Sequence, residues 1–561
     1  MLNSPGKVNV INLEVTSDVD DILKEIKENP KIIGGVIASD KPGCFIAGAD
    51  INLLSTIKSA EEATKLSRGV QQFLNIFETS KKPFVAAIMG SCLGGGLEVA
   101  LACHYRIAVD KKSVFGFPEV MLGLLPGAGG TLRLPKLVGL PNSLDMMLTG
   151  KNIRPDKAES MGLVDLVIPS LGPGFANGDL KIKRSPKGLF NVAQRNLLKT
   201  KYMKDYVFKQ ARKKVMKQSK GLYPAPLEIL EVVREGLDKP KEISSLAEAK
   251  GFGDLAASEQ SKGLISLYQG QTECKKFKYE KSRNPVKNIA VIGAGLMGAG
   301  VADISIRNEF KTVLKDTNQE NLGRGIEQIE KNIKLSQKKK KISSMHAEHY
   351  MSNLITTTDY DKFATTDMVI EAVFEDVDLK KKVLKDMEKV LPDHCIYATN
   401  TSALLVSDIA KASSRPEKVI GMHYFSPVDK MALLEIVKAD STSEDTVKKA
   451  VEVGLKQGKT PIVVKDGPGF YTTRIFMPMI IEVFRLMTEG VDPERIDNLC
   501  MALGFPVGGV VLSDEVGIDV GYHVYCYFVE VFGDRMKSID LSLGKAITEA
   551  GFLGNYSLLS M

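Results

Sequence analysis

Tryptophan is absent from this chain of 561 residues, and cysteine is scarce. The seven cysteines show no C-x-x-C spacing, so neither a disulfide framework nor a cysteine metal site is predicted. No apolar run reaches the roughly 18 residues that a membrane-spanning helix needs. The first residues, MLNSPGKVNV, resemble neither a signal peptide nor an arginine-rich transit peptide.

Charge and composition exclude further classes of protein. The formal net charge is +7, and the basic residues are not interleaved with aromatic residues, so nucleic-acid binding is not predicted. Hydrophobic residues make up 44% and charged residues 25% of the chain, as in ordinary globular proteins. The length is too great for one hydrophobic core and favours about three or four domains.

The order of apolar runs predicts an α/β protein. From Lys31 onward, β-branched runs such as KIIGGVIAS and KPFVAAIMG alternate with helical patterns, which is typical of βα units and a mainly parallel sheet. We predict a loop over residues 172–188, helices over residues 195–275, a second α/β unit from VKNIAVIGAG, and helices only from Gly469. The run SQKKKKIS near Lys338 is interpreted as a solvated helix end.

The stretch GSCLGGGLEVA places three consecutive glycines before a helical pattern that contains Glu98. Glycines at a helix start let backbone N–H groups approach an anion or a developing oxyanion. Burial of Glu98 would raise its pKa toward the range of acid–base catalysis. Tight helix–strand packing with a glutamate at the rim is the alternative that these residues leave open.

Two further stretches favour a catalytic site. GCFIAGADINLL supplies a glycine-flanked backbone corner at Ala49, and FGFPEVMLGLLPGAGG supplies a second carboxylate, Glu119. Two N–H donors and two carboxylates suit enolate chemistry on a thioester. The donors bind the thioester oxygen, while the carboxylates act as acid and base toward a water molecule.

Over about residues 31–167 these motifs resemble the crotonase (enoyl-CoA hydratase) superfamily. The resemblance implies that the amides of Ala49 and Gly95 form the oxyanion hole. It further implies that Glu98 activates water for attack on C3 and that Glu119 delivers a proton to C2 of an acyl-CoA thioester.

The motif VIGAGLMGAG gives G-x-G-x-x-G at Gly293, Gly295 and Gly298, directly after a strand-like run. Asp316 ends the next strand-like run, KTVLKD, where an acid binds ribose hydroxyls and disfavours a 2′-phosphate. We therefore predict NAD rather than NADP. A Rossmann domain that no longer binds a nucleotide is the alternative.

A second set of polar residues follows this motif. Asn400 and Ser402 come after a strand in ATNTSALLV, and His423 and Glu435 lie in VIGMHYFSPVDKMALLEI. A histidine can take a hydroxyl proton while a nearby carboxylate orients the imidazole ring. Taken alone, a histidine such as His423 is more often a structural residue.

Over about residues 287–554 these stretches resemble the L-3-hydroxyacyl-CoA dehydrogenase family. The resemblance implies that His423 is the base, Glu435 its partner, and Ser402 an aid to the substrate oxygen, with Asn400 near the nicotinamide. It also places Glu375 and Lys380 in the cofactor cleft. Thr473 stands where shorter-chain relatives carry an asparagine that supports the substrate. Because a hydroxyl can still donate a hydrogen bond, we interpret this difference as retuning of substrate binding.

The whole layout resembles the family of α subunits of the mitochondrial trifunctional β-oxidation enzyme. That resemblance implies a crotonase-like domain (1–194), a helical linker (195–285), a Rossmann NAD-binding domain (286–467) and a helical C-terminal dehydrogenase domain (468–561). It implies long acyl chains, a thiolase β subunit as partner, and a mitochondrial location with peripheral association at the matrix side of the inner membrane. Compared with that family, the chain is expected to be shortened at both ends, with only the first C-terminal repeat.

Two consecutive reactions are thereby predicted. Hydration of a trans-2-enoyl-CoA gives an L-3-hydroxyacyl-CoA, which the dehydrogenase oxidises with NAD to a 3-oxoacyl-CoA. Two alternatives stay open: an enoyl-CoA isomerase joined to the same dehydrogenase, and a shortened chain that serves only as a non-catalytic assembly partner. Retention of both Glu98 and Glu119 favours the hydratase, since addition of water needs a base and an acid.

Overall fold

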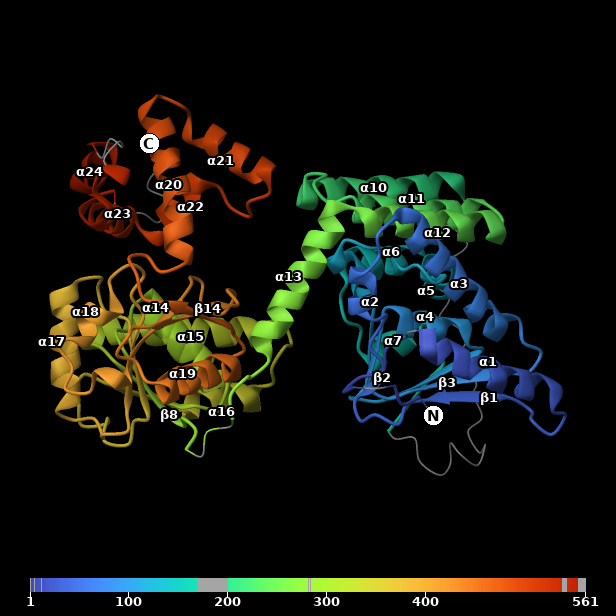
Figure 1. The fold of residues 1–561 in the computed structure, drawn as a ribbon, viewed down its shortest axis with the longest axis horizontal. Coiled ribbons are helices and arrows are strands. Elements are labelled where there is room, and N and C mark those ends of the chain that lie inside the picture. Colours follow the sequence, from blue (N-terminus) through green and yellow to red (C-terminus); the bar gives the residue numbers. More distant parts are fainter. Residues whose placement is uncertain are drawn as a thin grey trace. The chain divides into compact units, whose positions relative to one another are not determined.

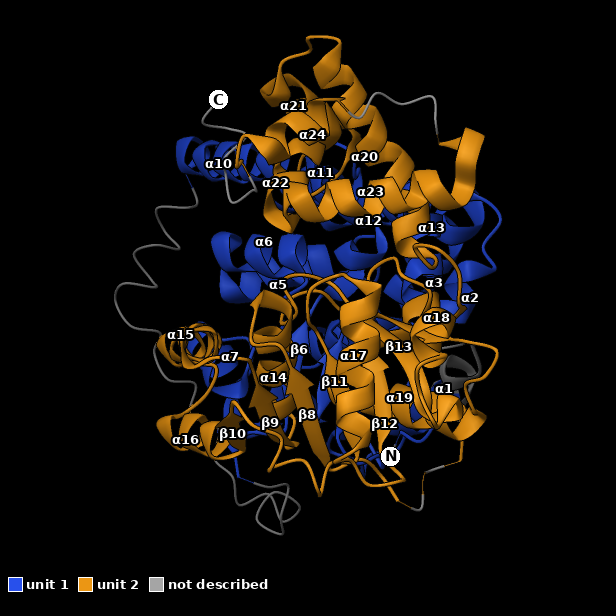
Figure 2. Cartoon of the chain, turned by 90° about the vertical axis from the view of Figure 1, so that its left-hand side faces the viewer, with its two compact units in different colours: residues 1–269 blue, residues 270–561 orange. Residues whose placement is uncertain are grey.

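The computed structural model describes residues 2–4, 6–11, 13–169, 200–280, 282, 284–536 and 542–552. The chain divides into two compact units, Met1–Gln269 and Gly270–Met561 (Figure 2). The boundary falls inside helix α13 (Glu259–Lys275). The loop that we predict over residues 172–188 lies outside the described residues.

Unit 1 is built on two parallel sheets, with strand orders β1-β3-β5-β7 and β2-β4-β6 (Figure 1). Its strands are β1 (Gly35–Ala38), β2 (Cys44–Ile46), β3 (Phe84–Ile88), β4 (Ser91–Leu93), β5 (Tyr105–Val109), β6 (Val114–Gly116) and β7 (Leu166–Ile168). Its first helices are α1 (Leu13–Glu28), α2 (Ile51–Ser55), α3 (Ala60–Thr79), α4 (Gly95–Ala102), η1 (Pro118–Leu122), α5 (Gly130–Val138), α6 (Leu140–Thr149) and α7 (Pro155–Met161). The predicted βα alternation and parallel pairing are confirmed.

Local sequence explains where the helices of unit 1 begin. The side chain of Ser59 accepts a hydrogen bond from the backbone N–H of Glu62, and Glu61 and Glu62 place negative charge in the first turn of α3. Helix α4 is instead preceded by Gly94 at its N-cap position, whose φ of 53° is unfavourable for residues with a side chain. The triple glycine therefore gives α4 an N-terminus without a side-chain cap.

The predicted helical linker packs into the core of unit 1. It consists of α10 (Lys201–Ser219), α11 (Ala225–Asp238) and α12 (Lys241–Ala257), followed by α13. Buried side chains of the first three, including Phe208, Ile229 and Phe252, belong to the hydrophobic cluster that also contains Leu97 of α4 and Phe117. These helices are thus part of the same compact unit as residues 13–169.

Unit 2 contains an eight-stranded sheet of order β10-β9-β8-β11-β12-β13-β14-β15, in which the β13–β14 pair is antiparallel and every other pair is parallel. Its strands are β8 (Asn288–Ile292), β9 (Lys311–Lys315), β10 (Leu354–Thr357), β11 (Met368–Glu371), β12 (Ile396–Thr399), β13 (Val419–Tyr424), β14 (Leu433–Lys438) and β15 (Thr460–Lys465). The helices between them are α14 (Leu296–Arg307), α15 (Gln319–Lys338), α16 (Ser344–Ser352), α17 (Val377–Glu388), α18 (Val406–Ala410), η2 (Pro416–Lys418) and α19 (Glu444–Lys456).

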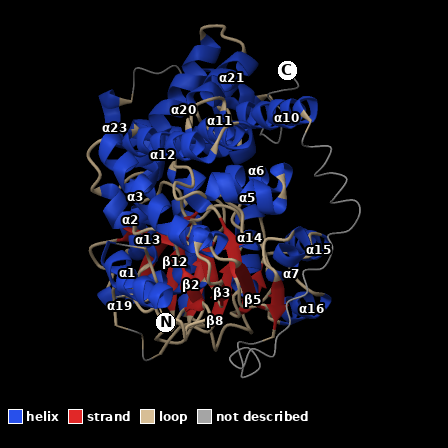
Figure 3. Cartoon of the chain, turned by 90° about the vertical axis from the view of Figure 1, so that its right-hand side faces the viewer, coloured by secondary structure: helices blue, strands red, loops and turns tan. Residues whose placement is uncertain are grey.

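Helices connect most of these strands, and Figure 3 distinguishes the two by colour, with helices blue and strands red. In β8, Ile289 and Val291 belong to one buried cluster, whereas Ala290 and Ile292 belong to another on the opposite face. Continuous apolar strands are expected where both faces are buried. Helix α15 ends at Lys338 as predicted, and the lysines that follow are exposed.

The rest of the described chain is helical, which confirms the prediction for residues beyond Gly469. The elements are α20 (Thr472–Thr488), α21 (Pro493–Leu503), α22 (Gly509–Val516), α23 (Ile518–Phe532), η3 (Gly533–Arg535) and α24 (Ser542–Glu549). The Asp497 carboxylate accepts hydrogen bonds from the amides of Val510 and Val511 at the start of α22, with the Val510 nitrogen at 2.8 Å. This buried carboxylate joins α21 to α22.

Arg106 on β5 provides a test of the packing of unit 1. Its guanidinium lies 2.9 Å from Asp165, with side-chain exposures of 4% and 8%, and donates to the carbonyl oxygens of Leu163 and Cys103. Arg106→Met leaves Asp165 without this partner and is expected to lower the free energy of unfolding of unit 1 by about 3–5 kcal/mol. Urea denaturation that monitors the two units separately measures the change.

Lys151→Met is the matched control, because Lys151 pairs with Asp145 at the surface, with side-chain exposures of 47% and 40%. Its loss is expected to cost below about 1 kcal/mol. Equal losses in the two variants would contradict the assignment of Arg106 as a structural anchor.

Candidate active sites

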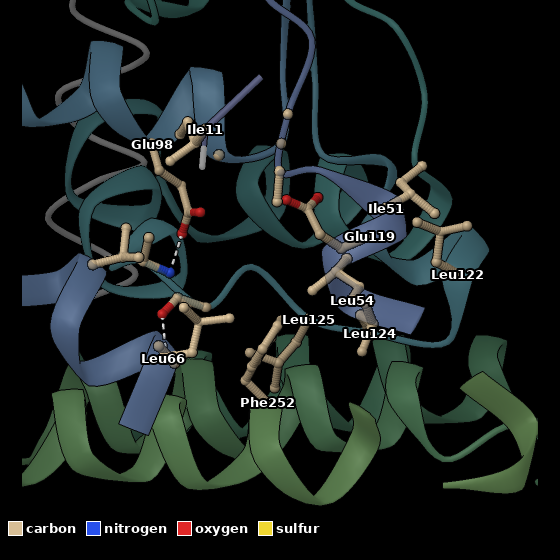
Figure 4. A pocket seen from close by; sticks show the side chains of 18 of the residues that line it. Ile11, Ile51, Leu54, Leu66, Glu98, Glu119, Leu122, Leu124, Leu125 and Phe252 are labelled. Atoms are coloured by element: carbon tan, nitrogen blue, oxygen red, sulfur yellow. Dashed lines mark hydrogen bonds between the residues drawn. The ribbon is translucent and has the colours of Figure 1, made fainter. Parts of the chain in front are cut away.

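Unit 1 contains an apolar cavity into which all four of its predicted site residues open. Ala49, Gly95, Glu98 and Glu119 line it. Figure 4 shows the Glu98 and Glu119 carboxyl groups entering the same space from α4 and η1. The rest of the lining is largely aliphatic or aromatic and includes Ile51, Leu54, Leu66, Leu124, Leu125 and Phe252.

Two backbone amides face this cavity without an acceptor. Among the described residues, neither the Ala49 N–H nor the Gly95 N–H has a hydrogen-bond acceptor. A Cβ atom added to Gly95 would lie 3.7 Å from the Ala49 nitrogen, so the two amides are neighbours. Gly95 is also the first residue of α4, where N–H groups have no partner within the helix. The pair can donate two hydrogen bonds to one oxygen atom.

Glu98 is buried on α4, with its Oε1 atom bound by backbone amides. The nitrogens of Ala128 and Gly130 lie 2.7 Å and 2.8 Å from Oε1. Burial, and then the negative charge of Glu248, raises the pKa of Glu98 to about 8, although the two amides oppose this rise. Glu98 can therefore exchange a proton near neutral pH.

Glu119 lies on η1, in a less polar environment. Among the described residues no group donates a hydrogen bond to its buried Oε2 atom. Burial, and then the charge of Glu98, raises the pKa of Glu119 well above its ordinary value. A Cβ atom at Gly94 would lie 2.9 Å from Glu119 Oε1, so glycine at this position leaves room for the carboxyl group. Glu119 is thus suited to hold a proton that it can donate.

Sequence reasoning missed two residues of this site, Glu248 and Phe252, which both lie on linker helix α12. Glu248 is fully buried and accepts hydrogen bonds from the turn that binds Glu98, while Phe252 lines the cavity. Their spacing of four residues places them on one helix face. No motif in the linker sequence signals this contact, because it depends on the packing of α12 against α3 and α5.

In unit 2 the predicted glycine motif forms a close turn between β8 and α14. Gly293 has a φ of 99°, and a Cβ atom there would lie 2.5 Å from the Ala372 oxygen. A Cβ atom at Gly298 would lie only 1.8 Å from the Gly293 oxygen, whereas one at Gly295 would meet nothing within 4 Å. The turn therefore leaves open space at the N-terminus of α14, which suits a pyrophosphate group.

Asp316 directly follows β9, next to this turn. Its Oδ2 atom accepts a hydrogen bond of 2.7 Å from the Ala294 amide. Burial opposes its ionisation, but hydrogen bonds from Ala294, Asn321 and Thr317 outweigh burial and keep its pKa below the ordinary value. An ionised carboxylate at this point can accept hydrogen bonds from ribose hydroxyls and repels a 2′-phosphate.

Lys380 and Glu375 belong to a buried network at the ends of β11 and β12. Lys380 Nζ lies 2.7 Å from Glu371 and 3.4 Å from Glu375. Burial works against the charge of Lys380, yet the two carboxylates raise its pKa. Glu375 also accepts a 2.8 Å hydrogen bond from the Ser402 amide, and Asn400 accepts one of the same length from the amide of Tyr424. The network fixes the loop that carries Ser402.

His423 and Glu435 lie opposite one another on the antiparallel strands β13 and β14. His423 Nδ1 is 2.7 Å from Glu435 Oε2, and the histidine ring is flanked by Phe425 and Phe470. Burial opposes ionisation of Glu435, but hydrogen bonds from His423 and Thr472 hold its pKa below the ordinary value. Since an ionised Glu435 accepts the Nδ1 hydrogen, Nε2 is the nitrogen that can take a proton from a ligand.

Thr472 is another residue that sequence reasoning missed. Its hydroxyl donates to Glu435 Oε2 at 2.7 Å, and its amide and that of Tyr471 donate to Oε1. Glu435 therefore caps the N-terminus of α20 while it holds His423. Among the described residues no hydrogen bond joins the predicted Thr473 to His423 or Glu435, and its role toward a substrate stays a prediction.

Comparison with protein families assigns three segments. Residues 1–172 match the family model for enoyl-CoA hydratase/isomerase. Residues 288–467 match the NAD binding domain of 3-hydroxyacyl-CoA dehydrogenase, and residues 469–558 match its C-terminal domain. The predicted order of a crotonase domain, a Rossmann domain and a helical dehydrogenase domain is confirmed, and NAD is the cofactor.

Several bacterial proteins are similar to this chain over nearly its whole length. A fatty acid oxidation complex subunit alpha from Shewanella putrefaciens is 42% identical over 96% of this chain and 77% of its own length. One from Shewanella sp. strain ANA-3 is 41% identical over the same shares. Among solved structures, (S)-3-hydroxybutyryl-CoA dehydrogenase from Ralstonia eutropha is 32% identical over 48% of this chain and 96% of its own, with a TM-score of 0.46.

The predicted mitochondrial location is wrong. The relatives that share 41% to 42% identity with this chain are subunits from Shewanella, and bacteria have no mitochondria. The peripheral inner-membrane association that accompanied this location loses its basis. Within the described ranges, no helix is long and apolar enough to cross a membrane. The shortening expected at both ends stays a prediction.

The glycine turn of unit 2 allows a test of nucleotide binding. Because a Cβ atom at Gly298 would lie 1.8 Å from the Gly293 oxygen, Gly298→Ala must displace the turn. NADH affinity is expected to fall by at least about tenfold, as measured by fluorescence titration.

Gly323→Ala on α15 is the matched control, since its Cβ atom would meet nothing within 4 Å. It is expected to leave NADH affinity unchanged. Undiminished affinity in Gly298→Ala would contradict a nucleotide site at this turn.

Proposed function

The chain belongs to the family of fatty acid oxidation complex α subunits, and from this membership we propose a residue-level mechanism for two consecutive reactions. The protein is a bifunctional enzyme of fatty acid β-oxidation, with an enoyl-CoA hydratase and an NAD-dependent 3-hydroxyacyl-CoA dehydrogenase on one chain. The residues assigned to each reaction below are our proposal. The acyl-chain length that the enzyme prefers stays a prediction.

In the hydratase, the amides of Ala49 and Gly95 bind the thioester oxygen of a trans-2-enoyl-CoA. Negative charge develops on this oxygen as water adds, so two donors stabilise the transition state more than the substrate. Glu98 takes a proton from water, whose oxygen forms the new bond to C3, and Glu119 gives its proton to C2. A later proton transfer from Glu98 to Glu119 restores the starting state.

The different environments of the two carboxyl groups support these roles. Glu98 is stabilised as a carboxylate by the amides of Ala128 and Gly130, whereas Glu119 Oε2 has no donor among the described residues. The group that ionises more easily is the base and the other is the acid. The presence of both groups favours hydration over isomerisation, since an isomerase moves one proton and needs no attacking water.

In the dehydrogenase, Nε2 of His423 takes the proton of the substrate C3 hydroxyl. Glu435, 2.7 Å from Nδ1, orients the ring and stabilises its charged form. We assign Ser402 as a hydrogen-bonding aid to the substrate oxygen, Asn400 to the nicotinamide side of the cleft, and Thr473 to substrate support. Bound NAD supplies the acceptor for the electron pair and hydrogen of the C3–H bond.

The residues of the β8–α14 turn fit NAD. Gly293, Gly295 and Gly298 leave room for a pyrophosphate at the N-terminus of α14, and Asp316 provides an ionised acceptor for the adenosine ribose. We assign the ion-paired residues Glu375 and Lys380 to the adjacent side of the cofactor cleft. The open space at Gly295, beside a helix N-terminus, supports this fit on geometry alone.

We propose that the chain works in a complex with a thiolase β subunit. The 3-oxoacyl-CoA made by the dehydrogenase is the substrate of a thiolase, and the name of the relatives describes a subunit of a complex. We further propose a division into a hydratase domain (1–194), a linker (195–285), an NAD-binding domain (286–467) and a helical domain (468–561), which the segments that match family models support.

The convergence of Ala49, Gly95, Glu98 and Glu119 on one apolar cavity is the observation that carries the hydratase assignment. It predicts a pH dependence. The kcat/KM of hydration should rise as Glu98 ionises, with a midpoint at about 8, and fall at higher pH as Glu119 loses its proton. Initial rates measured from about pH 6 to pH 10 test this, and a flat profile would contradict it.

Two single variants separate the reactions. Glu98→Gln should reduce hydration of a trans-2-enoyl-CoA by about 100-fold to 10,000-fold and leave oxidation of an L-3-hydroxyacyl-CoA with NAD intact. His423→Gln should show the reverse pattern, with the same range of loss. Spectrophotometric assays of each substrate on the full chain measure both steps. Loss of both activities in either variant would contradict two separate sites.

A further inference from the structure

Glu248 is the buried carboxylate that the mechanism above does not use. It lies on linker helix α12 and is fully buried, and no ion pair joins it to a cation among the described residues. Its oxygens instead accept hydrogen bonds from Gln71 Nε2 at 2.8 Å, the Gly129 amide at 2.5 Å, the Thr131 amide at 3.1 Å and the Thr131 hydroxyl. Burial raises the pKa of Glu248, but these donors and the charge of Arg133 oppose the rise. Glu248 thus accepts four hydrogen bonds from described residues, which matches an ionised carboxylate.

The same short turn serves two carboxylates in alternation. The amides of Ala128 and Gly130 donate to Glu98, while those of Gly129 and Thr131 donate to Glu248. This turn is the N-terminus of α5, where free amides and the helix dipole favour negative charge. A movement of Glu248 would therefore displace the two amides that hold Glu98.

We propose that Glu248 is a positioning residue for hydration, which fixes the turn from Ala128 to Thr131 and keeps a negative charge beside Glu98. This role rests on the proposed function of Glu98 as the base. The negative charge of Glu248 would assist catalysis because a base next to a fixed negative charge binds a proton more strongly, and so removes one from water more readily. The helical linker thereby supplies part of the hydratase machinery.

Three titratable or charged groups on three elements lie close to Glu98: Glu119 on η1, Glu248 on α12 and Arg133 on α5. The charge of Glu248 favours the protonated form of Glu98, and the charge of Arg133 favours its ionised form. Arg133 also pairs with Glu78 and donates a hydrogen bond to the Ala128 oxygen. Since the charge of Glu248 is the one that raises the pKa of Glu98, its removal should lower that pKa.

The test is the pH profile of hydration in Glu248→Gln, measured on the full chain. The rising limb of kcat/KM should move to lower pH by about one pH unit, and the limiting rate should fall by about tenfold. Oxidation of an L-3-hydroxyacyl-CoA should be unchanged, which shows that the chain is intact. A rising limb at the wild-type pH would overturn the proposal.

Thr131→Val is the matched control. It removes the hydrogen bond from the Thr131 hydroxyl to Glu248 but keeps the charge of Glu248. The rising limb of the kcat/KM profile should therefore stay at the wild-type pH even if unit 1 is less stable. An equal shift in both variants would overturn an electrostatic role for Glu248, because loss of packing alone would then explain it.

Glu248→Asp decides the case if Glu248→Gln gives no folded unit 1 by circular dichroism. It keeps the charge but shortens the side chain, so kcat should fall about tenfold with little change in KM and no shift of the limb. Wild-type kcat in this variant would overturn the positioning role. If the wild-type chain itself does not hydrate an enoyl-CoA, the proposed function fails, which is distinct from any result on Glu248.

Discussion

The burial of carboxylates among apolar side chains is the constraint on which unit 1 depends. Amides from a single turn keep Glu98 and Glu248 beside one another. Among the described residues neither carboxylate forms an ion pair, and Glu119 has a carboxylate oxygen without any donor. Such groups are costly to bury and are retained where their proton affinity is useful. The triple glycine, the turn before α5 and the packing of α12 all serve to make this arrangement possible.

In unit 2, buried carboxylates are instead paired with cationic or hydrogen-bonding groups. Glu435 is held by His423 and by the N-terminus of α20, and Lys380 lies between Glu371 and Glu375. Hydrogen bonds from His423 and Thr472 keep the pKa of Glu435 low, so His423 is oriented as a proton acceptor, whereas burial in unit 1 raises the pKa of Glu98 and Glu119. The two environments correspond to the two kinds of proton transfer that consecutive hydration and oxidation require.

Local patterns were sufficient to predict most of the fold and many site residues. The glycine motifs, the apolar strands and the run from His423 to Glu435 each carry a signal within a short segment. Glu248, Phe252 and Thr472 were missed because their roles arise only when α12 packs against the hydratase core and when the N-terminus of α20 meets Glu435 on β14. The predicted mitochondrial location was wrong for another reason. The motifs reflect chemistry that bacterial relatives share, and they carry no information on the cellular compartment.

The most direct test of the account is one reaction that contains the purified chain, a trans-2-enoyl-CoA and NAD, with the conjugated thioester and NADH followed together by absorbance. If both sites act on one chain, absorbance of the enoyl thioester falls first, and NADH appears after a lag that shortens as more enzyme is added. NADH formation from added L-3-hydroxyacyl-CoA should show no lag. Consumption of the enoyl thioester without NADH, or no consumption at all, would contradict a chain that performs both steps.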